Sequence, residues 1–164
     1  MVVDLDGALP DRAIALGVTV ADWRAAIRAA GERLVASGAT TAAYTDEMIG
    51  TVETLGPYIV IAPGIALAHS RPSPAVLRTG LSWVHLATPV EFGNAQNDPV
   101  RLVIGLAALD HDAHIDVLAA VGAALSDPAR LRALDAAETP TSVRDILARA
   151  TSTTEQDTNR EQGN

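Results

Sequence analysis

The segment from Val100 to Ala108, VRLVIGLAA, is apolar at nearly every position and limits the fold more than any other stretch of the chain. A strand with one face in water alternates apolar and polar side chains, whereas a strand covered on both faces is apolar throughout. The segment therefore predicts a central strand with helices on both sides of its sheet. Strand and helix patterns interleave along the rest of the chain. Together they predict an α/β fold, a three-layer α/β/α domain with a mixed central sheet flanked by helices.

The other elements follow from hydrophobic periodicity and from turn-forming residues. Strands are expected at residues 13–16, 58–61, 65–68 and 80–86, and helices at 22–36, 45–55, 113–125, 128–136 and 141–150. Residues 72–79 are expected to form a loop or a short helix. Residues 1–150 then make one domain. Residues 151–164 contain no apolar side chain and are expected to form a disordered tail.

Charge and composition exclude several classes of function. The chain has 164 residues and a formal net charge of −8, which argues against a nucleic-acid partner and favours a basic protein partner. Its lack of cysteine excludes disulfides, thiolate zinc sites and a cysteine nucleophile. The amino-terminal residues are acidic, and the longest apolar run, 102–109, is far shorter than the roughly 20 residues of a membrane helix. We expect a cytoplasmic protein without direct membrane insertion.

Residues 62–72, APGIALAHSRP, hold the strongest candidate for chemistry. Two short apolar strands joined by a proline-glycine turn lead to His69, and Ser70 and Arg71 follow directly. One interpretation is a histidine at the edge of the core whose ring bonds a backbone carbonyl. The other is a nucleophilic imidazole beside a short hydrogen-bond donor and a planar cation suited to phosphate.

The other three histidines differ in their surroundings. His85 lies in the middle of a predicted strand and is expected to be a packed or sheet-surface residue. His111 and His114 lie near a predicted helix amino terminus, where free N–H groups and the helix dipole favour an anion. Taken alone, this pair with its two neighbouring aspartates indicates first a solvated turn and second a weak metal site.

The segments GPYIVIAPGIALAHSRP and TGLSWVHLATPVEFGNAQNDPVRLVIGLAALDHDAHIDVL place several motifs in a fixed order. They resemble the mannitol/fructose-type enzyme IIA domains of the bacterial sugar phosphotransferase system, and the ascorbate-type branch in particular. The resemblance implies that His69 accepts a phosphoryl group from the phosphocarrier protein HPr and passes it to a cysteine of enzyme IIB. It also implies that His114 is an active-site partner and that His111 is peripheral. One departure is Ala68, which stands where the family usually has proline before the phosphorylated histidine.

Several expectations follow from this resemblance. Ser70, Arg71 and His114 become the candidates for stabilising the phosphoryl oxygens. No metal and no other cofactor is required, because the phosphoryl group arrives already activated on a partner histidine. Enzyme IIB would connect the chain to the membrane component, enzyme IIC, for uptake of a sugar or sugar acid. A second copy of the chain is a candidate partner in a homodimer.

Two other classes of function stay open. A regulatory enzyme IIA-like module would keep the fold and the phosphorylated histidine, but its phosphorylation state would signal to a protein partner. A noncatalytic structural domain would treat His69 as a packed residue and would explain Ala68. The presence of both His69 and His114 in their motifs argues against this last class.

Overall fold

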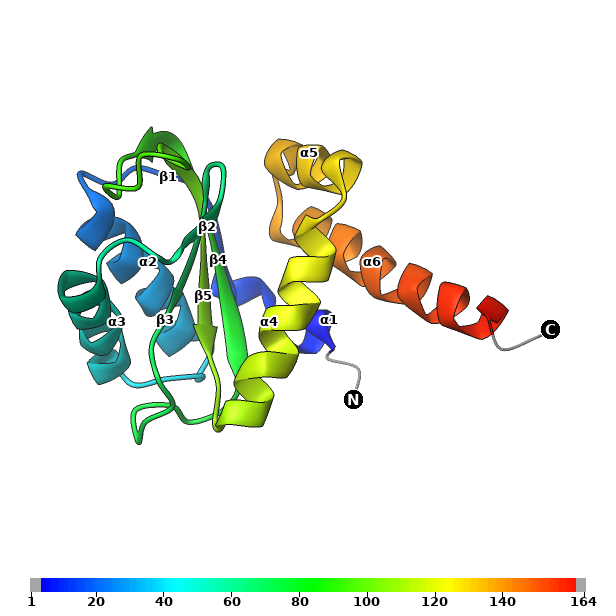
Figure 1. The fold of residues 1–164 in the computed structure, drawn as a ribbon, viewed down its shortest axis with the longest axis horizontal. Helices are drawn as coiled ribbons and strands as arrows, with labels where there is room; N and C mark the ends of the chain where they lie inside the picture. Colours follow the sequence, from blue (N-terminus) through cyan, green and yellow to red (C-terminus); the bar gives the residue numbers. More distant parts are fainter. Residues whose placement is uncertain (1–3, 162–164) are drawn as a thin grey trace.

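The computed structural model describes residues 4–161, the last of them (151–161) by their backbone alone, and places five strands in one sheet. The strand order is β1-β4-β5-β3-β2 (Figure 1). Strands β1 (Ile14–Val18) and β4 (Gly80–Val90) are parallel, and β5 (Val100–Ala107) runs antiparallel to β4. Strand β5 is parallel to β3 (Ile65–His69), whose other neighbour, β2 (Val60–Ala62), is antiparallel. The α/β fold with a mixed sheet is therefore confirmed.

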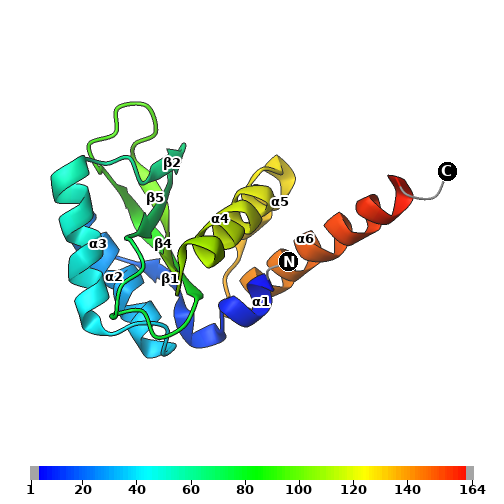
Figure 2. The ribbon, with the colours of Figure 1, turned by 60° about the horizontal axis from the view of Figure 1, so that its bottom comes forward.

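Helices cover both faces of this sheet, which gives three layers (Figures 1 and 2). Helices α2 (Trp23–Ala36) and α3 (Ala42–Leu55) pack on one face. The other face carries α4 (His111–Leu125), α5 (Pro128–Ala136), α6 (Pro140–Glu161) and the short α1 (Leu5–Ala8). A 3-10 helix, η1 (Asp11–Ala13), leads into β1. None of the helices in the described part of the chain is both long and apolar enough to cross a bilayer.

The central strand β5 contributes to two separate apolar cores. Val103 and Ala107 belong to the core beneath α2 and α3, whereas Leu102, Ile104 and Leu106 belong to the core beneath α4 to α6. Successive side chains of a strand point to opposite faces, so a strand between two helix layers needs apolar residues at consecutive positions. This requirement accounts for the unbroken apolar run in the sequence.

Helix α2 approaches the sheet closely at Gly105. A Cβ atom at Gly105 would collide with the hydroxyl of Ser82 and press on Leu34. Ser82 is fully buried in β4, and its hydroxyl donates a hydrogen bond to the carbonyl of Ala30 in α2 at 2.8 Å. The buried hydroxyl is therefore satisfied, and it ties the helix to the sheet.

The parallel pairing of β3 and β5 brings the ends of both strands to one edge. His69, the last residue of β3, is opposite Leu106 near the end of β5. The chain then enters α4 at Asp110, whose carboxylate accepts a hydrogen bond from the N–H of Ala113 at 2.8 Å. Both segments that carry the predicted histidines thus reach the same edge of the sheet.

Several boundaries differ from those expected. Strand β4 continues to Val90, with an irregular register after His85, because β5 extends beside it. Residues 72–79 form a loop, one of the two expected alternatives, and Val76 in this loop makes a β-bridge with Thr40. Helix α6 continues to Glu161, through most of the segment 151–164 that was expected to be a disordered tail. No proline or glycine interrupts that segment before residue 163. Residues 162–164 of the expected tail lie outside the described residues.

Gly31 supplies a test of the packing between α2 and α3. A Cβ atom there would overlap the side chain of Thr45, so Gly31→Ala should lower the free energy of unfolding by about 1–3 kcal/mol. Gly122, on the exposed side of α4, faces open space and is the matched control. Gly122→Ala should raise the free energy of unfolding by up to about 1 kcal/mol, because alanine favours the helix. Urea unfolding followed by circular dichroism measures both; a Gly31→Ala protein as stable as the wild type would contradict this packing.

Candidate functional site

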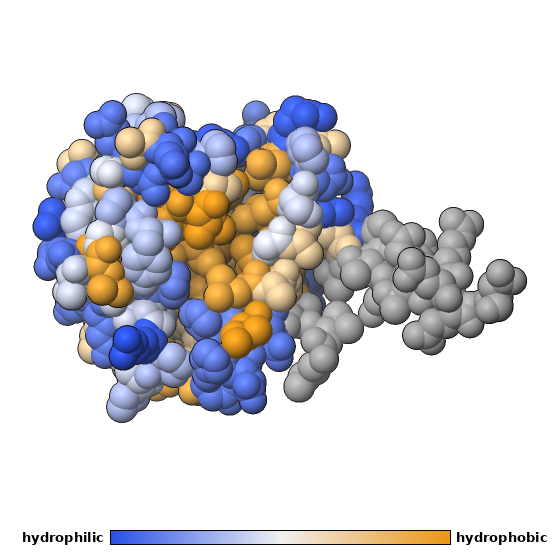
Figure 3. Space-filling view, viewed as in Figure 1, coloured by the Kyte–Doolittle hydropathy of each residue, from blue (hydrophilic) through white to orange (hydrophobic). Residues whose placement is uncertain are grey.

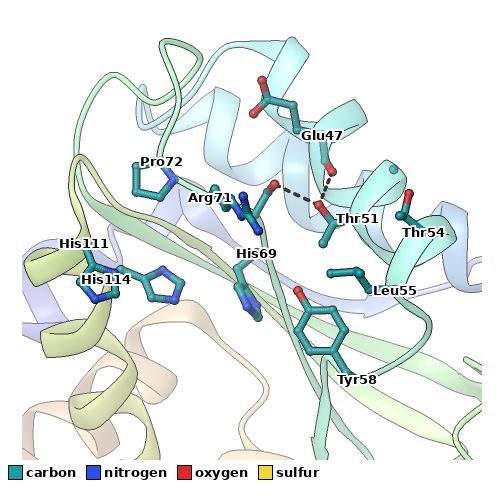
Figure 4. A pocket seen from close by; sticks show the side chains of 12 residues that line it. Glu47, Thr51, Thr54, Leu55, Tyr58, His69, Arg71, Pro72, His111 and His114 are labelled. Carbon is teal, nitrogen blue, oxygen red and sulfur yellow. Dashed lines mark hydrogen bonds between the residues drawn. The ribbon is translucent and has the colours of Figure 1, made fainter.

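A cleft of about 670 Å³ lies at the edge of the sheet where β3 ends (Figure 4). One wall comes from the second half of α3 and from Tyr58, and the other from His111 and His114 in α4. Residues His69 to Pro72 form its floor and rim. The cleft thus contains all the site residues that the sequence analysis selected.

The His69 side chain is held in one tautomer by the backbone. Its Nδ1 lies 2.7 Å from the carbonyl oxygen of Leu67, and because a carbonyl can only accept, Nδ1 carries the proton. The other ring nitrogen, Nε2, then has a free lone pair. The two interpretations of His69 are therefore compatible: the bond to a carbonyl is present, and it prepares the opposite nitrogen to act as a nucleophile.

Alternation along β3 decides what His69 faces. Ile65 and Leu67 point into the core beneath α4, so His69, two residues further on, lies on that same side. Its ring centroid is 5.3 Å from that of His114. On another side, Tyr58 meets the His69 ring edge-on, with 5.7 Å between the centroids. His69 is thus only partly buried, between an aromatic ring and a second imidazole.

His114 is an uncharged hydrogen-bond donor in this arrangement. Burial, and then the positive charges that His69 and His111 would carry, hold the pKa of His114 below its usual value. Its Nδ1 is buried and has no hydrogen-bond partner among the described residues. We assign the proton of the neutral ring to Nε2, because this assignment leaves an acceptor rather than an N–H without a partner at the buried Nδ1. His114 then has one N–H left to offer to a group in the cleft.

Ser70 is occupied elsewhere in this structure. The Thr51 hydroxyl donates to the carbonyl of Glu47 at 2.9 Å, so the Ser70 hydroxyl, 3.0 Å away, donates to Thr51. The N–H of Ser70 donates to the Tyr44 hydroxyl at 2.9 Å. Both donors of Ser70 therefore point toward α3 rather than into the cleft.

Arg71 is the cation of the cleft. It is exposed at the rim next to His69 (Figure 4), and no carboxylate in the described residues forms an ion pair with it. A free guanidinium can bind two oxygens of one phosphoryl group through parallel N–H bonds. The cleft therefore combines a nucleophilic nitrogen, an N–H donor and a free cation.

Of the other two histidines, one lies outside the cleft and one lies at its rim. His85 lies on β4 outside the cleft, with Nε2 3.6 Å from a carboxylate oxygen of Asp135 in α5. His111 lies exposed at the rim.

Ala68 is fully buried on the α3 side of β3, and the strand continues through it. The presence of alanine in place of the usual proline therefore leaves His69 at the strand end. In the described residues, no group of three or more histidine, aspartate or glutamate side chains could hold a metal ion.

Sequence reasoning missed the residues of α3 and Tyr58. Tyr44, Glu47 and Thr51 form a polar stripe that bonds the segment after His69, with Glu47 accepting from the Ser73 hydroxyl at 2.7 Å. Their spacing of three and four residues places them on one helix face, a signal that was present in the sequence. Tyr58 was assigned only to the start of a strand.

Several known proteins are similar to this chain over most of its length. A family model, "Phosphoenolpyruvate-dependent sugar phosphotransferase system, EIIA 2", matches residues 8–150. The ascorbate-specific PTS system EIIA component of Salmonella typhimurium is 34% identical over 145 residues, which cover 88% of this chain and 94% of the relative. The mannitol-specific cryptic phosphotransferase enzyme IIA CmtB from Escherichia coli has a TM-score of 0.78 at 30% identity, over 88% of this chain and 98% of that one.

A further solved structure shows such a domain with a partner. It is the complex of enzyme IIAMTL with phosphorylated enzyme IIBMTL from Escherichia coli. Its matching chain has a TM-score of 0.75 at 30% identity, over 85% of this chain and 96% of that one. The similarity to these proteins extends over most of the chain.

The low pKa of His114 can be tested by substitution of a neighbour. His111→Gln should raise the pKa of His114, because a like charge disappears while the burial of His114 is unchanged. NMR titration of the imidazole signals measures the effect. An unchanged or lower His114 pKa in the variant would contradict the arrangement of the three rings.

The same pKa has a consequence for stability. Because the folded pKa of His114 lies below the unfolded value near 6.5, the unfolded chain binds more protons between the two values. The contribution of His114 to the free energy of unfolding is complete above about pH 6.5 and is lost as the pH falls through the folded pKa. His114→Gln should therefore reduce the loss of stability on acidification below that pH, as measured by urea unfolding at several pH values.

Proposed function

Because this chain belongs to the EIIA 2 family of the phosphoenolpyruvate-dependent sugar phosphotransferase system, we propose that Nε2 of His69 is the atom that carries its phosphoryl group. The chain is a phosphoryl carrier of such a system, as its family and relatives indicate. The observation that carries the assignment of the atom is the bond from Nδ1 to Leu67, which leaves Nε2 as the nucleophilic nitrogen at the cleft.

The transfer exchanges one nitrogen–phosphorus bond for another. The lone pair of Nε2 attacks phosphorus, and the bond from phosphorus to the donor histidine breaks and returns its electron pair to that ring. No proton has to leave His69 during attack, because Nδ1–H stays bonded to the carbonyl of Leu67. The positive charge that the ring acquires is partly compensated by that carbonyl and by the attached phosphoryl oxygens.

The surroundings of His69 supply stabilisation for those oxygens. His114 offers an N–H from the opposite wall, and Arg71 offers an unpaired cation at the rim. Phosphoryl transfer depends mainly on positioning and on stabilisation of charge on the equatorial oxygens, and both groups fit that requirement. The Ser70 hydroxyl can bind these oxygens only if it turns away from Thr51. Its main role is therefore to hold the segment that carries Arg71.

The net charge of the chain and its family indicate its partners. The donor is HPr, presenting a basic surface to a chain of formal net charge −8, and the acceptor is an enzyme IIB cysteine that serves the membrane enzyme IIC. Three apolar side chains are exposed around His69: Leu55 and Tyr58 in the cleft, and Ile115 beside His114. They offer such partners an apolar contact surface that excludes water. Figure 3, viewed as Figure 1, shows apolar surface gathered at the centre of the view, between the sheet and α4. A carrier between these partners acts in the cytoplasm. The compound that the system takes up is a sugar or a sugar acid such as ascorbate.

Incubation with enzyme I, HPr and phosphoenolpyruvate tests the assignment. We expect one acid-labile phosphoryl group per chain, mapped to His69 by mass spectrometry, and none on the His69→Ala protein. His85→Ala is the matched control, because His85 lies outside the cleft, and it should be labelled like the wild type. Label on His114, or label that persists in His69→Ala, would overturn the assignment.

His114 should affect the rate without carrying the group. Loss of one such donor typically slows a reaction by about a hundredfold, or roughly 3 kcal/mol, so His114→Ala should accept phosphate at His69 about that much more slowly. His114→Gln retains an N–H near the position of Nε2 and should recover part of the rate. Rapid-quench measurement with phospho-HPr decides the point. Equal rates for His114→Ala and the wild type would remove His114 from the mechanism.

A further inference from the structure

The hydroxyl of Tyr44 lies between two backbone groups at the exact place where β3 and β5 separate. Tyr44 is fully buried in α3. Its hydroxyl is 2.7 Å from the carbonyl oxygen of Leu106 and 2.9 Å from the nitrogen of Ser70. A phenol has one proton, and the carbonyl of Leu106 is a closer acceptor than that of Ser70, which is 3.3 Å away. The hydroxyl therefore donates to Leu106 and accepts from the Ser70 N–H.

This hydroxyl occupies the position of a ladder hydrogen bond. The parallel register of β3 and β5 ends at the pair His69 and Leu106. In a parallel ladder, the N–H that follows one member of such a pair can bond the carbonyl of the other, which here means Ser70 to Leu106. The Tyr44 hydroxyl stands between these two groups and bonds both, so at this end of the ladder the strands are joined through it.

The two arms of the chain that leave this point carry Arg71 and His114, and His69 ends β3 just before it. From β3 the chain passes through Ser70 and Arg71 toward α3, and from β5 it enters α4 with His114. The first arm is also tied to α3 through Thr51, which accepts from the Ser70 hydroxyl, and through Glu47, which accepts from Ser73. Tyr44 is the member of this polar stripe that bonds both arms at once.

Burial preserves the arrangement over a wide pH range. It raises the pKa of Tyr44 to about 12, ahead of the smaller effects of its neighbours, so the phenol keeps its proton. With that proton in place, the donor bond to Leu106 and the acceptor role toward Ser70 persist together.

We propose that Tyr44 is a positioning residue for phosphoryl transfer, because its hydroxyl, inserted between β3 and β5, sets the separation of the His69 and His114 rings. The inference rests on the proposed function for its consequence in catalysis, but its structural part concerns the unphosphorylated protein. Tyr44 does not line the cleft, and its hydroxyl bonds Ser70, which follows His69, and Leu106, which is paired with His69.

The test compares Tyr44→Phe with Ser82→Ala. Both remove a buried hydroxyl that donates to a backbone carbonyl, but the Ser82 bond ties α2 to the sheet outside the cleft. NMR of the unphosphorylated proteins reports the His69 Nδ1–H signal and the contacts between the two rings. Rapid-quench kinetics at varied phospho-HPr concentration give the maximal rate and the half-saturating concentration separately.

We expect both variants to be less stable to urea and only Tyr44→Phe to change the ring signals. Its maximal rate should fall by about tenfold to a hundredfold, the range expected when a reacting group is displaced slightly, with the half-saturating concentration of phospho-HPr unchanged. Unchanged ring signals together with a wild-type maximal rate in Tyr44→Phe would overturn the proposal. An equal fall in Ser82→Ala would also overturn it, since general destabilisation would then explain the loss.

Two further results of the experiment can be interpreted. If wild-type protein is not phosphorylated by HPr, the proposed function fails, while the NMR comparison still decides whether Tyr44 positions the rings. If Tyr44→Phe does not fold, the comparison uses 4-aminophenylalanine introduced at this position, whose amine still donates to Leu106 but accepts poorly from the Ser70 N–H. Changed ring signals and a slower maximal rate in that variant would support the proposal, and wild-type values of both would reject it.

Discussion

Parallel pairing of β3 with β5 decides where each part of the site lies. Both strands run in the same direction, so their carboxyl ends reach one edge, and the backbone after each strand continues toward a different helix layer. Alternation along β3 then divides the functional residues. His69 faces α4 and meets His114, whereas Ser70 faces α3 and meets Tyr44 and Thr51. An antiparallel pairing would have placed the two histidines at opposite ends of the sheet.

The sequence was sufficient for the elements that depend on local pattern. The apolar run of β5, the strands around the Pro63-Gly64 turn and the helices that flank them follow from periodicity and turn chemistry, and Gly64 has the positive φ of +77° that the turn requires. The resemblance supplied the pairing of His69 with His114, which no local pattern contains. The extension of α6 past residue 150 was missed, because a polar segment without proline or glycine fits a helix as well as a tail.

The contacts of Tyr44 and Ser70 show what a single sequence withholds. Tyr44 bonds Ser70 and Leu106, which are 26 and 62 residues away along the chain, so its role depends on the completed sheet. Ser70 was selected as a phosphate donor because of its position beside His69 and Arg71. Its hydroxyl has a competing acceptor in Thr51, and only the fold reveals that acceptor. Residue type and neighbourhood predict what a side chain can bond, but the tertiary structure determines which of those bonds forms.

The three-layer arrangement has a mechanical consequence for the cleft. Its walls belong to different layers, since α3 stands on one side of the sheet and α4 on the other. The sheet is the common support of both layers, and its strands are twisted relative to one another. The width of the cleft therefore depends on how the two helix layers are seated on the sheet. Substitutions that move α4 relative to α3 can therefore change how tightly a phosphoryl group is held, while the groups that touch it stay the same.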